Sequence, residues 1–184
     1  MKTLHCITLF CALLFSTSIV FAQASEREKG IEFYNKGEYQ KAVESLQKAV
    51  ETDEEDKNAW LYLGMSHARL KKQSLAEKAL NKADKISTKN KESAEAQAQV
   101  KIIAKPRPSY TDSARMAQTQ GIVKIAVEFG ADGKIKAIVP FVNLPEGLTQ
   151  MSVAAAKQVK FEPAVKDGKP YSTIGILSYS FRIY

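Results

Sequence analysis

The second half of the chain has the hydrophobic pattern of β-strands. Apolar and polar residues alternate over residues 122–129, which predicts a strand with Lys124 and Glu128 on its polar face. A hairpin turn follows, and residues 134–142 are predicted to form the returning strand. Residues 172–184 are predicted to form the last strand. Its apolar face would carry Leu177, Tyr179, Phe181 and Ile183.

Two helices are predicted around these strands. Residues 111–118 begin with Thr and Asp, which are favoured at helix N-termini. Residues 148–157 place Leu148, Met151 and Ala155 on one stripe. The resulting element order is α-β-β-α-β, which indicates a small antiparallel sheet with helices on one face.

The first half of the chain repeats itself after 34 residues. The matched pairs are Gly30 and Gly64, Ala42 and Ala76, Leu46 and Leu80, and Ala49 and Ala83. Small and apolar residues in register at this period resemble the tetratricopeptide repeat, in which each unit is a pair of antiparallel helices. The resemblance covers residues 23–90 and implies two units.

The inner face of tetratricopeptide arrays binds peptides, and the resemblance implies which side chains face it. By the helix spacing of the family these are Arg27, Tyr34, Asn35, Met65 and Arg69. The alternative is that two units only hold a partner or dimerise. Two units bury less surface than a free-standing array needs. Residues 91–99 are therefore expected to add a capping helix, within a capping and linking segment of residues 91–105.

Two polar features of this region have structural explanations. His67 stands where the repeat family has an aromatic residue, so we expect it to pack rather than to catalyse. The acidic run of residues 51–56 is predicted to be a solvated turn between the units, because no glycine bends it into a calcium-binding loop.

A second resemblance covers the strand-rich half. Its motif residues are Pro106, Tyr110, Gly121, Asp132, Gly133, Phe161, Pro163, Gly168, Pro170 and Phe181. Their order and spacing resemble the TonB C-terminal domain, which we assign to residues 106–184. The resemblance implies that an extended segment of an outer-membrane receptor adds a strand to the sheet edge at residues 172–184. The alternative is that this edge pairs with a second copy and gives a homodimer.

The N-terminus has the pattern of a secretory signal peptide. A single lysine, an apolar stretch and small residues near Ala22 predict cleavage that removes residues 1–22, together with both cysteines. The alternative is an uncleaved inner-membrane anchor facing the periplasm, because residues 3–25 carry no charge and are long enough to span a bilayer.

Charge and composition narrow the function further. The chain has 27 Lys and Arg residues against 20 Asp and Glu residues, a net charge of +7. The basic residues are dispersed and not interleaved with stacking aromatic residues, so we do not expect nucleic-acid binding. No catalytic, cofactor-binding or metal-binding constellation is recognisable, so no enzymatic activity is expected.

Together these patterns predict an α+β protein of two domains, with helical hairpins followed by a small antiparallel sheet domain. The expected function is that of a periplasmic adaptor in a Gram-negative bacterium. It would dock an envelope or outer-membrane protein by strand addition or groove binding. The alternative is a membrane-anchored TonB-type energy transducer for receptor-dependent transport, which residues 91–105 would have to connect with an unusually short linker.

Overall fold

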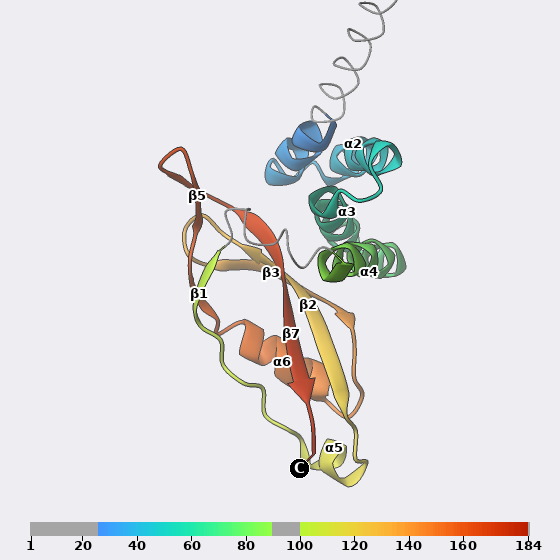
Figure 1. The fold of residues 1–184 in the computed structure, drawn as a ribbon, viewed down its shortest axis with the longest axis vertical. Helices are drawn as coiled ribbons and strands as arrows, with labels where there is room; N and C mark the ends of the chain where they lie inside the picture. Colours follow the sequence, from blue (N-terminus) through green and yellow to red (C-terminus); the bar gives the residue numbers. More distant parts are fainter. Residues whose placement is uncertain (1–25, 90–99, 184) are drawn as a thin grey trace, which may run out of the picture.

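The computed structural model describes residues 26–89 and 100–183 (Figure 1). The predicted signal peptide and the predicted capping helix of residues 91–99 lie outside the described residues. Within the two described ranges, no helix combines the length and the apolar character needed to cross a membrane.

The first described range consists of two helical hairpins. Residues 26–35 are helical and are followed by α2 (Tyr39–Thr52), α3 (Lys57–Arg69) and α4 (Gln73–Lys89). Residues 53–56 of the acidic run form the turn between the hairpins, whereas residues 51 and 52 are the last of α2. The last residue of the run, Asp56, caps α3 by accepting a 3.0 Å hydrogen bond from the backbone N–H of Ala59.

The 34-residue period has a physical basis in two equivalent contacts. A Cβ atom added to Gly30 would lie 2.5 Å from the Cγ atom of Leu46, and one added to Gly64 would lie 2.7 Å from the Cγ atom of Leu80. In each hairpin a leucine of the second helix thus packs directly on a glycine of the first. Larger side chains would force the paired helices apart.

The second described range is built on a three-stranded antiparallel sheet in the order β3-β2-β7. The strands are β2 (Gly121–Phe129), β3 (Ile135–Val142) and β7 (Thr173–Phe181), and the helices are α5 (Asp112–Met116) and α6 (Leu148–Ala156). One face of β2 and β7 packs with α6 in a core that includes Val123, Ile125, Val127, Leu148, Ala156, Leu177, Tyr179 and Phe181. This α5-β2-β3-α6-β7 order is the predicted one.

Four short strands were not predicted. β1 (Lys101–Ala104) pairs with β4 (Lys160–Glu162), and β5 (Ala164–Lys166) pairs with β6 (Lys169–Tyr171). Three or four residues are too few to show a periodicity. The segment predicted as cap and linker, residues 91–105, therefore contains a strand. The last strand is also shorter than predicted, because it ends at Phe181 and leaves Ile183 beyond it.

The opposite face of the sheet packs against the helical hairpins. Ala126 of β2, Phe141 of β3 and Ile174 of β7 share one core with Leu61 and Met65 of α3. Figure 1 shows α3 and α4 beside the upper end of the sheet, and α6 lower down, across β7. The sheet is therefore covered on both faces, once by its own helix and once by the N-terminal hairpins.

Candidate binding cleft

The predicted inner face of the hairpins is turned toward the sheet. Tyr34 is only 3% exposed, and its hydroxyl donates a 2.7 Å hydrogen bond to the Glu128 carboxylate of β2. Arg69 donates to the same carboxylate over 2.7 Å and forms an ion pair with it. Met65 is fully buried. Part of the predicted groove is therefore occupied by the chain's own sheet.

The burial of Tyr34 and its contact with Glu128 keep the Tyr34 hydroxyl protonated. Burial raises the pKa of Tyr34 far above its usual range, and the Glu128 carboxylate raises it further. Burial also raises the pKa of the neighbouring Tyr62 hydroxyl. A tyrosine that stays protonated can only donate to a carboxylate, so the contact keeps its direction over the whole physiological pH range.

A second ion pair lies four residues away on the same face of β2, roughly 13 Å along the strand. Lys124 contacts Asp84 of α4 at 2.6 Å, and the two side chains are 21% and 17% exposed. Between the two ion pairs, Ala126 packs into the shared core. The polar face of β2 is thus complementary to the hairpins, with a cation, an apolar residue and an anion in alternate positions.

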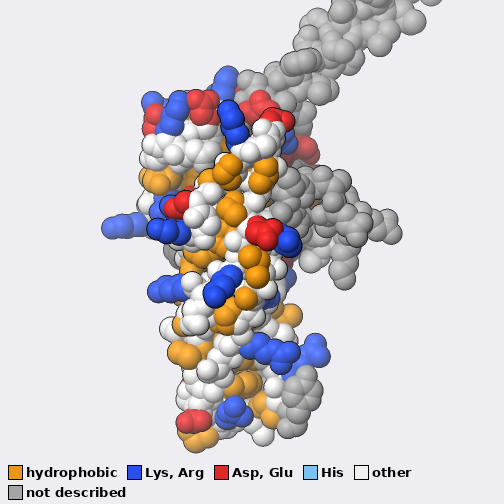
Figure 2. Space-filling view, turned by 90° about the vertical axis from the view of Figure 1, so that its left-hand side faces the viewer, with side chains coloured by type: hydrophobic (Ala, Val, Ile, Leu, Met, Phe, Trp, Pro, Cys, Tyr) orange, Lys and Arg blue, Asp and Glu red, His pale blue; other side chains and the backbone are white. Residues whose placement is uncertain are grey.

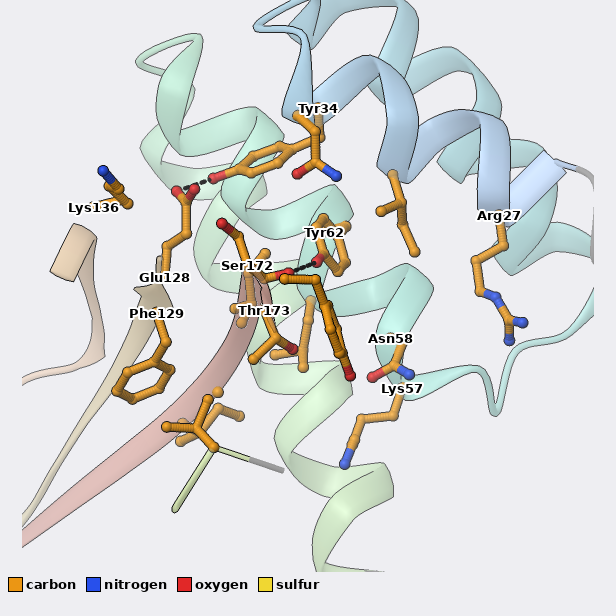
Figure 3. A pocket seen from close by; sticks show the side chains of 18 of the residues that line it. Arg27, Tyr34, Lys57, Asn58, Tyr62, Glu128, Phe129, Lys136, Ser172 and Thr173 are labelled. Atoms are coloured by element: carbon orange, nitrogen blue, oxygen red, sulfur yellow. Dashed lines mark hydrogen bonds between the residues drawn. The ribbon is translucent and has the colours of Figure 1, made fainter. Parts of the chain in front are cut away.

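The rest of the inner face opens on a cleft of about 1120 Å³ between the hairpins and β7 (Figure 3). Of the five predicted groove residues, Arg27, Tyr34, Asn35 and Arg69 line the cleft. The opposite wall is formed by residues 172–177 at the start of β7. The hydroxyl of Tyr62 donates a 3.4 Å hydrogen bond to the backbone carbonyl of Ser172, so the two walls meet at one end.

The predicted side-chain set on β7 does not face this cleft as a group. Leu177, Tyr179 and Phe181 are 6%, 4% and 3% exposed and pack in the α6 core. Ile183 is 41% exposed but lies after the strand. Only Leu177 of the four lines the cleft. The part of β7 available to a partner is its backbone edge.

The contact of Lys105 shows which backbone groups of β7 point away from β2. The Lys105 ammonium group donates a 2.7 Å hydrogen bond to the carbonyl of Ser178, a residue that is paired with Lys124 on the other side of β7. The Ser178 carbonyl therefore points away from β2, and so do those of Ile176 and Ile174, because backbone groups alternate along a strand. Burial lowers the pKa of Lys105, which also lies 4.8 Å from the centre of the Tyr179 ring.

The open part of the edge is short. Among the strands in the described part of the chain, β7 pairs with β2 alone. Lys105 covers the edge at Ser178, so residues 172–177 are the stretch that faces the cleft. An extended chain segment is the occupant that such an edge accepts, because its unpaired N–H and C=O groups need backbone partners.

Sequence reasoning missed the polar residues that join the two parts of the molecule. Lys124 and Glu128 were assigned to the polar face of a strand, with no partner. One signal was available: the same face also carries Ala126, Ile174 and Ile176. Apolar residues on both faces of a sheet indicate that both faces are covered.

The other polar residues give weaker evidence of a functional site than the cleft does. In residues 26–89 and 100–183, no group of three or more His, Cys, Asp and Glu side chains is placed to hold a metal ion. His67 is 8% exposed, as expected for a packing residue, and burial lowers its pKa. Lys and Arg side chains are spread along the face shown in Figure 2 and do not gather in one patch.

Comparison with known proteins bears on the second half of the chain. Residues 106–183 match the family model of the Gram-negative bacterial TonB protein C-terminal. Among solved structures, the chain is similar to the solution NMR structure of the Pseudomonas aeruginosa TonB CTD, with 24% identity and a TM-score of 0.38, over 48% of this chain and 90% of that one. No curated protein matches the chain. The family match identifies residues 106–183 as a TonB C-terminal domain.

Proposed function

We propose that the chain is a periplasmic adaptor that docks a protein of the Gram-negative cell envelope. In this proposal residues 23–90 are two tetratricopeptide units, and residues 106–184 are the TonB C-terminal domain. The partner, such as an outer-membrane receptor segment, binds by strand addition to β7 or in the groove of the hairpins. The protein has no enzymatic role in this proposal.

The open edge of β7 at residues 172–177 is the observation that carries the proposal. It belongs to the domain that the family match identifies, and it has no strand partner in the described ranges other than β2. Backbone pairing at such an edge supplies affinity, and alternate side chains supply selectivity.

The tetratricopeptide assignment is supported by the repeated glycine–leucine contact. Gly30 with Leu46 and Gly64 with Leu80 occupy equivalent places in the two hairpins, 34 residues apart. A period of 34 residues with small residues at helix contacts is typical of this family.

The experiment that tests the proposal blocks the edge without removing the strand. Deleting β7 would take Leu177, Tyr179 and Phe181 out of the core and unfold the domain. Ile176→Pro instead removes one N–H group that points away from β2, and proline is tolerated on strand edges. Full-length protein carrying this change should capture less envelope protein from solubilised membranes than the wild type.

Ile122→Pro is the control for introducing a proline into the same sheet. Ile122 is 46% exposed on β2 and precedes the residues that pair with β3, which begin at Lys124. Its capture should equal that of the wild type. Equal capture by wild type and Ile176→Pro, with all three proteins folded by circular dichroism, would overturn docking at β7.

The second candidate is a membrane-anchored energy transducer, which the TonB family match favours as well. It differs from the adaptor in retaining residues 1–22. The intact mass of the protein in membrane and soluble fractions separates the two. A full-length chain confined to the membrane supports the transducer, and a shortened chain in the soluble fraction supports the adaptor.

A further inference from the structure

We propose that the cleft binds one extended acidic peptide that contacts the hairpins and β7 at the same time. This inference rests on the proposed function, and it names the chemistry of the partner at the same edge. The two modes of docking, groove binding and strand addition, then become two walls of a single site.

The first argument is the placement of the walls. Residues of α3 line one side of the cleft, among them Lys57, Asn58 and Tyr62, and residues 172–177 line the other (Figure 3). A strand added to β7 would run about 4.8 Å from it. The hydrogen bond from Tyr62 to the Ser172 carbonyl shows that α3 side chains reach the backbone of this edge.

The second argument is the direction of side chains. Ile174 and Ile176 pack in the core shared with the hairpins. Residues directly opposite each other on paired strands place their side chains on the same face of the sheet. Peptide residues opposite Ile174 and Ile176 would therefore point toward the hairpins, and the residues between them would point the other way.

The third argument is size. The cleft of about 1120 Å³ exceeds the ~300–1,000 Å³ of ordinary small-molecule sites. It has room for a short strand, and the hairpins that line its other wall limit the space for a folded second copy of the domain. The space therefore favours a peptide over a small ligand or a β7-to-β7 dimer.

Charge decides which peptide fits. The lining includes the cations Arg27, Lys57, Arg69, Lys136 and Lys166, and the anions Glu28 and Glu128. Glu128 is already held by Tyr34 and Arg69. Lys57 and Lys166 have no ion-pair partner in the described part of the chain, so they are the cations available to a ligand. Complementary charge favours a peptide with carboxylate side chains.

The test uses three synthetic peptides with blocked ends and a fluorescent label. The first is Thr-Glu-Val-Glu-Val-Glu-Thr, the second replaces each Glu by Lys, and the third repeats the first with N-methyl groups on alternate backbone nitrogens. Binding to the full-length protein is measured by fluorescence anisotropy. We expect the Glu peptide to bind, and the Lys peptide and the N-methylated peptide to bind at least several-fold more weakly.

Protein variants locate the site. Lys57→Glu with Lys166→Glu should weaken the Glu peptide by about three- to tenfold and strengthen the Lys peptide, given the usual strength of exposed ion pairs. Lys48→Glu with Lys78→Glu makes the same charge change at exposed residues that do not line the cleft, and should alter neither affinity.

Two results would overturn the inference: equal affinity for the Glu and Lys peptides, or identical effects of the two double variants. Either would leave the proposed function standing if Ile176→Pro still abolishes capture of the envelope partner. Loss of peptide selectivity and intact capture by Ile176→Pro together would overturn both proposals.

Discussion

Tyr34 and Glu128 are 94 positions apart in the chain, yet the tyrosine hydroxyl donates a 2.7 Å hydrogen bond to the carboxylate. The contact joins the helical hairpins to the central strand of the sheet. Arg69 donates to the same carboxylate, whose side chain is only 12% exposed. Together with the Lys124–Asp84 ion pair and the shared apolar core, Glu128 thus holds the two parts of the molecule in one arrangement.

The first prediction concerns this carboxylate. Glu128→Gln removes the charge that Arg69 pairs with, and it should lower the free energy of unfolding by about 1.5–3 kcal/mol, the usual range for hydrogen bonds to charged groups. Urea unfolding of the full-length protein measures the change. Asp132→Asn is the control, because its ion pair with Lys136 is exposed to solvent and should contribute much less to stability. Equal losses in the two variants would contradict a special role for Glu128.

The sequence alone predicts the alternation of apolar and polar residues along β2. It does not predict which residues cover the polar face of the strand. Residues 122–129 show period two, so Val123 and Lys124 were correctly placed on opposite faces. A charged residue on a strand has the same pattern whether it meets solvent or an ion-pair partner. Asp84 and Tyr34 come from another part of the chain, and no local spacing indicates that they meet β2.

The predicted groove residues show the same limit of prediction from sequence. Helix spacing indicated that Tyr34 and Arg69 share a face, and both contact Glu128. That the face is partly filled by the chain's own sheet depends on tertiary packing. The short strands β1 and β4 were missed for a different reason: a strand of three or four residues, exposed as β1 is throughout, carries no hydrophobic periodicity.

The second prediction tests the equivalence of the two hairpins. Gly64→Ala should lower the free energy of unfolding by about 1–3 kcal/mol, because the new Cβ atom would lie 2.7 Å from Leu80. Gly30→Ala should cause a similar loss through Leu46. The double variant Gly64→Ala with Leu80→Ala should lose less than the sum of its single changes, since removing the leucine relieves the overlap. Strict additivity in denaturant unfolding would argue against this contact.

The third prediction concerns pH. Burial lowers the pKa of His67 below its ordinary 6.5, so the unfolded chain binds its proton more tightly than the folded one. The stability contributed by neutral His67 is complete above pH ~6.5 and falls as the pH drops below that value toward the folded-state pKa. The melting temperature should therefore decrease more between pH 7.5 and pH 5 in the wild type than in His67→Phe. Parallel melting curves for the two proteins would contradict the prediction.

The fourth prediction concerns self-association at the edge of β7. Lys105 donates to the Ser178 carbonyl and places a charge beside it, and edge lysines oppose the pairing of strands between molecules. The wild type should remain monomeric in sedimentation velocity experiments at micromolar concentration, since the hairpins also stand beside the open stretch of residues 172–177. Lys105→Ala frees the Ser178 carbonyl and should increase self-association. The exposed Lys169→Ala is the control for charge loss. A stable wild-type dimer, dissociated by Ile176→Pro, would instead show that a second copy occupies the edge that we assign to a peptide.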